Sequence, residues 1–244
     1  MKIGKKRKLI YRARKWHRYL GLILGIQFLL WTLGGLYFSW TNIDEIRGDN
    51  LKNEKPNLVF EQDLVSPALF LNHHLTSTDS LLSLKLVAVL KEPFYEMVFN
   101  SKGKEKVKLI NALNGKMRLP LNKEDAIAIA KEKLKVEANV AKVELLTETN
   151  SHHEYRERPL PAFAITFKAP ASTTVYVSQD YGNVQTFRNS KWRIFDFLWM
   201  MHTMDYQERD NFNNWLLRLF SVFGLVTIFS GFTLYYLTSK KWFR

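Results

Sequence analysis

The chain has 244 residues, with 36 lysines and arginines against 23 acidic residues and no cysteine. The lack of cysteine excludes disulfides, thiolate catalysis, cysteine-ligated metal clusters and covalently attached c-type haem. A net charge of +13 would favour a nucleic-acid partner, but nine cations lie in residues 1–18 and three in residues 240–244. The rest of the chain is close to neutral, so we expect no nucleic-acid binding.

Residues 1–18 thus form a basic tail that we expect in the cytoplasm, and residues 19–43 follow it without a formal charge. An apolar helix needs about 20 residues to cross the hydrocarbon core of a bilayer. The run is longer than the apolar core of a cleaved signal peptide, and no A-x-A-like site follows it. We therefore predict a transmembrane helix over residues 19–43 that stays attached to the chain.

Residues 44–118 and 119–190 are predicted to form two similar α+β units, each a helix followed by a three-stranded antiparallel sheet. A weakly helical run interrupted by Pro67 opens the first unit, and a capping-box-like pattern at Asn122 opens the second. Tyr181-Gly182 predicts a tight turn with glycine at positive φ. The predicted segments are a helix over 60–74 with strands over 83–90, 94–100 and 106–111, then a helix over 122–134 with strands over 141–146, 162–168 and 173–178.

Residues 191–213 carry aromatic side chains at helical spacing, which fits a helix in the outer membrane interface or a core helix of the α+β region. Residues 214–239 contain the second charge-free run and predict a second transmembrane helix, followed by the basic tail 240–244. Because cationic flanks stay in the cytoplasm, we expect both termini there and the α+β region on the other side.

Small residues on both predicted spans indicate close helix packing. They pack either the two spans against each other, or one span against a partner helix or a flat cofactor. The glycines concerned are Gly21, Gly25, Gly34, Gly35, Gly224 and Gly231.

Two sets of motifs resemble one known family. The sequence VYVSQDYGNV at residues 175–184 resembles the last strand and turn of PepSY domains, with Tyr181 in place of the usual threonine. The PepSY-associated transmembrane helix is similar to the first span in its Trp16-His17, Gly21, Gly25 and Trp31, and the aromatic stretch 191–206 resembles the segment before the next span in such proteins. The resemblance implies an α+β fold of two tandem PepSY-like units in the periplasm, anchored in a bacterial inner membrane.

His17 and His202 are candidate ligands of haem b, because the resemblance extends to siderophore reductases that hold this cofactor between helices through histidines. They are expected at opposite membrane faces, about 30 Å apart, so they cannot bind one haem within one chain. Each would need a symmetry mate or a histidine of another subunit. Alternatively, His17 completes a cluster for lipid headgroups and His202 anchors an interfacial helix.

No motif in the sequence assigns a catalytic or metal-binding set, and the histidine pairs at 73–74 and 152–153 fit solvated loops. We therefore predict a non-enzymatic, membrane-anchored accessory module. Its expected partners are the lipid bilayer and either a membrane or periplasmic protein or a second copy of the chain. The alternative is a haem-b subunit of a transmembrane electron-transfer system, such as one that reduces siderophore iron. Inhibition of a peptidase is a third possibility, implied by the resemblance alone.

Overall fold

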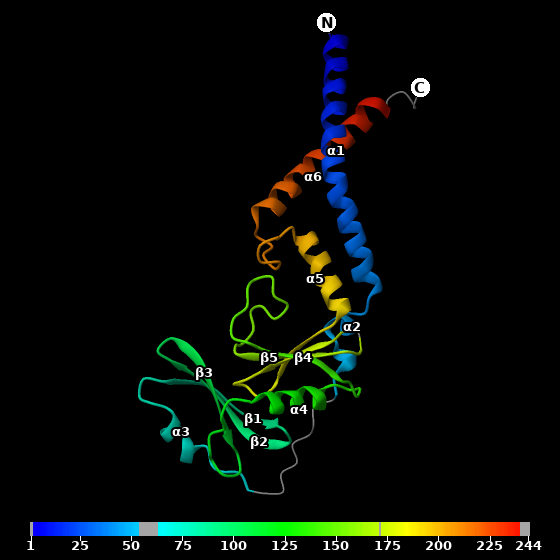
Figure 1. The fold of residues 1–244 in the computed structure, drawn as a ribbon. Helices are drawn as coiled ribbons and strands as arrows, with labels where there is room; N and C mark the ends of the chain where they lie inside the picture. The colour runs from blue at the N-terminus through cyan, green and yellow to red at the C-terminus, as the bar shows by residue number, and fades with distance from the viewer. Residues whose placement is uncertain (1, 54–62, 171, 240–244) are drawn as a thin grey trace. The chain divides into compact units, whose positions relative to one another are not determined.

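The computed structural model describes residues 2–53, 63–170 and 172–239. They form two units, shown in Figure 1. The helical unit contains the residues up to Asn42 and from Ile194 onward, and the sheet unit contains residues 43–193.

Two long helices dominate the helical unit: α1, Lys2–Trp40, and α6, Trp215–Ser239. Both are long and apolar enough to cross a membrane, with a mean hydropathy of 1.7, and only 17% and 6% of their apolar windows are buried. The core helix of a soluble domain would be mostly buried, so this exposure favours apolar surroundings. The predicted basic tail continues α1 without a break, since none of its residues stops a helix.

Helices α1 and α6 pack on each other as an antiparallel pair (Figure 1). The less exposed positions of α1 recur every three or four residues, among them Leu20, Leu24 and Gln27. Gly224 and Gly231 of α6 lie against α1. This spacing places the less exposed residues on one side of α1, where α5 and α6 contact it.

Helix α5, Ser190–Thr203, runs along α1 within the helical unit from Ile194 onward. The ring of Phe195 lies 4.8 Å from that of Phe38. Gln27 of α1 donates a hydrogen bond of 2.9 Å to the carbonyl of Met201. The helix predicted within residues 191–213 therefore exists, and its aromatic side chains contact another helix.

The sheet unit contains two antiparallel sheets, one of order β1-β2-β3 and one of order β4-β5-β6-β7. A helix precedes each sheet, as the sequence predicts. The bounds are α2 Ile43–Arg47, η1 Asp49–Leu51, α3 Ala68–His74, β1 Ser80–Val89, β2 Glu92–Ser101, β3 Lys104–Asn111, α4 Lys123–Lys133, β4 Val140–Leu146, β5 Ala162–Phe167, β6 Thr174–Ser178 and β7 Val184–Arg188.

Two predictions for this unit need correction. The second sheet has four strands, because β7 pairs with β6 directly after the Gly182 turn. Its five residues are too few to show a clear alternation in the sequence. Helix α3 begins after Pro67 and is not interrupted by it, since proline fits the start of a helix, where no N–H partner is needed. The predicted helical residues 60–62 lie outside the described residues.

The two sheets share one hydrophobic core with α4. Val89 and Leu109 of the first sheet belong to the same cluster as Ile165 and Phe187 of the second and Ile129 of α4. A smaller cluster, centred on Phe70 and Tyr95, lies under α3. The repeated pattern of helix and sheet therefore folds as one body.

The turn at Gly182 joins the sheets at their closest approach. Gly182 has the positive φ that the sequence predicts, +63°. A Cβ at this position would lie 2.8 Å from Leu109 Cδ1 and 3.3 Å from both methyl groups of Val89. Glycine fits without rearrangement, whereas a larger residue would be strained by the positive φ and would displace the side chains of Leu109 and Val89.

We expect Gly182→Ala to lower the free energy of unfolding by about 2–4 kcal/mol, the sum of left-handed backbone strain and overpacking. Gly103→Ala is the matched control, because Gly103 has a φ of +79° but a Cβ there would meet nothing within 4 Å. It should cost about 1–2 kcal/mol. Thermal unfolding of the full chain in detergent measures both, and equal losses would contradict the close approach.

Candidate functional site

His17 lies in the contact between the two long helices. Its Nδ1 is 2.8 Å from Ser230 Oγ, and this hydroxyl donates to the carbonyl of Thr227 at 2.7 Å. The hydroxyl has a single hydrogen, so in the tautomer in which Ser230 donates to Thr227 it accepts from His17 Nδ1. A Cβ at Gly231 would lie 3.2 Å from His17 Cε1, so glycine makes room for the ring.

His202, near the end of α5, lies among aromatic rings. Its ring centroid is 5.6 Å from that of Trp31 on α1, 6.1 Å from that of Phe38 and 6.2 Å from that of Trp199. His202 Nδ1 is buried without a hydrogen-bond partner among the described residues, and so is Trp31 Nε1. A buried polar atom without a hydrogen bond lowers the stability of the fold. A further polar group could therefore bind beside His202 Nδ1 and Trp31 Nε1.

His17 and His202 lie at different heights along the axis of α1. His202 contacts Trp31, which follows His17 by fourteen residues, or about 21 Å of helix. Two axial ligands of one haem must face each other across its iron, so these imidazoles do not fit one haem within one chain. Each of them offers a single imidazole, and haem ligation by either stays a prediction.

The six glycines of the predicted helix contacts divide into two groups. Gly34 lies near Phe38 and Leu198, Gly224 near Phe28, and Gly231 against His17. A Cβ at the other three would meet nothing within 4 Å, and these are Gly21, Gly25 and Gly35. The packing predicted for this second group is not made by the described residues, so it stays a prediction about a partner.

The loop between α5 and α6 is ordered by carboxylates. Arg209 pairs with the buried Asp196 of α5. Asp205 accepts backbone N–H groups of Gln207, Glu208 and Asn211 at 2.8–3.3 Å. These bonds satisfy two buried carboxylates, for which the lack of a partner would be costly.

Several arginines gather near Trp192 in the sheet unit, and we call this group the arginine–tryptophan cluster. The guanidinium of Arg188 lies 3.9 Å from the Trp192 ring centroid, and that of Arg156 lies 5.9 Å from it. Arg158 donates to the carbonyl of Gln185 on β7. Burial, and then the charge of Arg158, lower the pKa of Arg188 to about 10. The cluster consists of Arg156, Arg158, Arg188, Trp192 and Arg193.

Glu154 is the carboxylate that holds this cluster together. Its Oε2 accepts from Arg193 Nε at 2.7 Å, and its Oε1 accepts from Arg193 at 2.9 Å and from the Tyr176 hydroxyl at 2.7 Å. Burial alone would raise the pKa of Glu154, but the bonds from Arg193 and Tyr176 outweigh it and lower this pKa. Both carboxylate oxygens are thus engaged, and Arg188 donates a further hydrogen bond of 2.8 Å to the backbone carbonyl of Glu154.

The sequence analysis missed this cluster. The sequence feature that could have indicated it is the group of arginines at 156, 158, 188 and 193, in a region of otherwise balanced charge. Two of them, Arg188 and Arg193, lie close in sequence to Trp192. Strands β5–β7 intervene between the first pair and the second, so their proximity depends on the sheet. Arginine beside tryptophan is typical of surfaces that bind proteins, since both side chains combine apolar area with hydrogen-bond donors.

We expect Glu154→Gln to lower the free energy of unfolding at neutral pH by about 1–3 kcal/mol, because an amide cannot accept both bonds of Arg193. The stabilisation by Glu154 is complete above its usual pKa of 4.5 and is lost as the pH falls through the lowered value. The difference from the unaltered chain should therefore shrink below about pH 4.5.

Glu144→Gln is the matched control, since the pair of Glu144 with Lys142 is exposed and should contribute less than about 1 kcal/mol. Unfolding by urea at several pH values measures both variants. A loss at Glu154 that does not change with pH would contradict a role of its charge.

Comparison with known proteins identifies the family to which the chain belongs. The searches of curated proteins and of solved structures gave no match. The family model described as "PepSY-associated TM region" matches residues 14–244, which include α1 from Arg14 onward, the whole sheet unit and α6. The chain therefore belongs to the PepSY-associated TM region family, and it is a membrane-associated PepSY protein.

Proposed function

We propose that the protein is a non-enzymatic accessory module, anchored in the bacterial inner membrane by α1 and α6, whose sheet unit docks a protein partner in the periplasm. The observation that carries the proposal is the arginine–tryptophan cluster, where Arg156 and Arg188 flank the Trp192 ring and Arg193 binds the Glu154 carboxylate. Arginine and tryptophan are enriched where proteins bind each other, and acidic side chains on a partner surface are complementary to a basic cluster of this kind.

The order of the elements supports this placement. An earlier residue of α1, His17, contacts a later residue of α6, Ser230, while Phe28 lies near Gly224. The pair is therefore antiparallel, and the ends of the two helices that carry the basic tails lie together. The positive-inside rule puts these ends in the cytoplasm. The sheet unit follows α1 at its opposite end, on the periplasmic side.

The natural lack of cysteine allows a direct test of this docking. A single cysteine in place of the exposed Glu157, beside the cluster, is labelled with a membrane-impermeant maleimide that carries a photo-crosslinker. In spheroplasts we expect labelling at this position and, after illumination, one cross-linked product of discrete mass. Arg156→Glu with Arg158→Glu should reduce the product at least about tenfold, because like charges then face each other.

Two controls make the result decisive. A cysteine in place of the exposed Lys102, on the turn between β2 and β3, should be labelled but give no such product. A cysteine in place of Lys8 should be labelled only after permeabilisation. Labelling of Lys8→Cys in intact spheroplasts would contradict the orientation. A product that survives both charge reversals would contradict docking at the cluster, and turnover of a substrate by the purified chain would contradict a non-enzymatic role.

A second candidate function rests on His17. The hydrogen bond between Nδ1 and Ser230 fixes the orientation of the ring, and in the tautomer with the proton on Nδ1 the Nε2 atom can bind iron. In this alternative, haem b bound by His17 or His202 together with a histidine of another copy would carry electrons to an outer acceptor such as ferric siderophore. Two glycines of α1 that have no close neighbours, Gly21 and Gly25, would then face the partner helix.

We expect the alternative, if it holds, to give a Soret absorption band in the protein purified in detergent from cells supplied with haem. His17→Ala or His202→Ala should then remove the band, because the axial bond is lost. His152→Ala, at an exposed position of the sheet unit, is the control and should leave it unchanged. A colourless preparation would exclude this function.

A further inference from the structure

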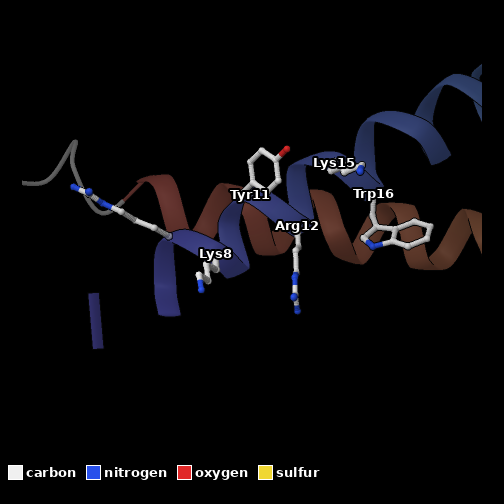
Figure 2. Close-up of a pocket in the computed structure, with 6 residues that line it drawn as sticks. Lys8, Tyr11, Arg12, Lys15 and Trp16 are labelled. Atoms are coloured by element: carbon white, nitrogen blue, oxygen red, sulfur yellow. The ribbon is translucent and has the colours of Figure 1, made fainter. Parts of the chain in front are cut away.

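One face of α1 near its N-terminus forms an open basic hollow of about 780 Å³. All the residues that line it come from α1, and Figure 2 shows five of them, Lys8, Tyr11, Arg12, Lys15 and Trp16, beside Arg7. The side chains of Lys8, Arg12 and Trp16 follow each other at intervals of four residues, so they share one side of the helix. We call these six residues the basic face.

The charge of the basic face has no counterpart on the two long helices. The first acidic residue of the chain is Asp44, after the end of α1, and α6 contains none. Four cations, Arg7, Lys8, Arg12 and Lys15, therefore lie on the basic face without a carboxylate on their own helix or on the neighbouring one. Such a cluster attracts anions from its surroundings.

The basic face points away from α6. His17 faces α6, where it bonds to Ser230. At about 100° per residue, Lys8 and Lys15 stand roughly half a turn from His17 around the helix axis. Their side chains are thus directed toward whatever surrounds the helix pair, which for α1 and α6 is a lipid environment.

Two exposed tryptophans of α1 indicate where the basic face lies relative to the bilayer. Trp16 is 66% exposed and Trp40 is 84% exposed. They are 24 residues apart on one unbroken helix, or about 36 Å, slightly more than the roughly 30 Å of a hydrocarbon core. Tryptophan collects at both membrane interfaces. If Trp16 and Trp40 lie at the two interfaces, Lys15 and Arg12 lie within about 6 Å of Trp16 along the helix, on the side away from the hydrocarbon core. This is the level of the lipid phosphates.

We propose that the basic face binds the headgroup phosphate of an anionic phospholipid. Arg12 offers paired donors to two phosphate oxygens, Lys8 and Lys15 add point charges, and Tyr11 and Trp16 pack against the adjoining glycerol and acyl chains. The depth distinguishes a lipid from a soluble anion, since the donors lie beside an aromatic ring at the membrane boundary. The proposal rests on the membrane placement of α1 in the proposed function, and on neither docking nor haem.

The test uses the full chain in phosphatidylcholine vesicles with trace spin-labelled phosphatidylglycerol or phosphatidylcholine. Electron paramagnetic resonance gives the relative association of each labelled lipid with the protein. We expect a preference for phosphatidylglycerol of at least about fivefold, the contribution of a single cation near a membrane surface, and a weaker preference in high salt. The triple variant Lys8→Gln, Arg12→Gln, Lys15→Gln should associate equally with both lipids.

A control variant removes three exposed lysines of the sheet unit, Lys102→Gln, Lys104→Gln and Lys123→Gln, and should keep the full preference. Equal association of both lipids with the unaltered chain, or an unchanged preference in the first triple variant, would overturn the proposal. Loss of the preference on addition of millimolar glycerol 3-phosphate would also overturn it, in favour of a soluble anion. Resistance to alkaline extraction from pure phosphatidylcholine vesicles measures membrane insertion separately, so that failure of the two ideas can be told apart.

Discussion

Two helices whose leucine, isoleucine and phenylalanine side chains face outward impose the main constraint on this protein. Leu22, Ile26, Leu29, Phe229 and Phe232 are each at least 60% exposed, and this apolar area has to be removed from water. A helix satisfies its own backbone N–H and C=O groups, so it tolerates apolar surroundings that no loop would tolerate. The polar side chains of the helical unit then need partners among themselves.

The polar contacts of the helical unit follow from this constraint. His17 bonds to Ser230, Gln27 to a carbonyl of α5, and Asp196 to Arg209. Each joins two segments, so each fixes how one lies on the other, which apolar contacts alone leave loosely defined. The exceptions are four side chains with a buried polar atom that has no hydrogen-bond partner among the described residues, namely Trp31, His202, Arg209 (at Nε) and Thr227. They are the positions in this unit where binding of a further group would gain most.

The sheet unit obeys the opposite rule, since its apolar residues face inward and its charges face outward. A single core joins both sheets, and the Gly182 turn brings them together where a side chain would be strained. The arginine–tryptophan cluster is a second organising centre. Glu154 ties Arg193 to Tyr176 on β6, while the Trp192 ring is flanked by arginines. These contacts hold the side chains of the cluster in fixed positions relative to one another, which reduces the entropy lost when a partner docks.

The sequence by itself determined the elements with a strong local pattern. The charge-free runs gave both long helices, Asn122 marked the start of α4, whose Asp125 N–H it accepts, and Gly182 marked its turn. The family followed from motifs on these same elements. Each of these signals acts over a few neighbouring residues, through hydrophobicity, capping or backbone conformation, and so can be read without the fold.

Only the tertiary structure decided which residues meet. It added β7, whose five residues become a strand because β6 offers its free edge, and it separated the glycines that touch a neighbour from those that do not. It also assembled the arginine–tryptophan cluster from segments some thirty residues apart. These outcomes depend on long-range packing, whose free energy comes from contacts between distant parts of the chain, and no local pattern in the sequence encodes them.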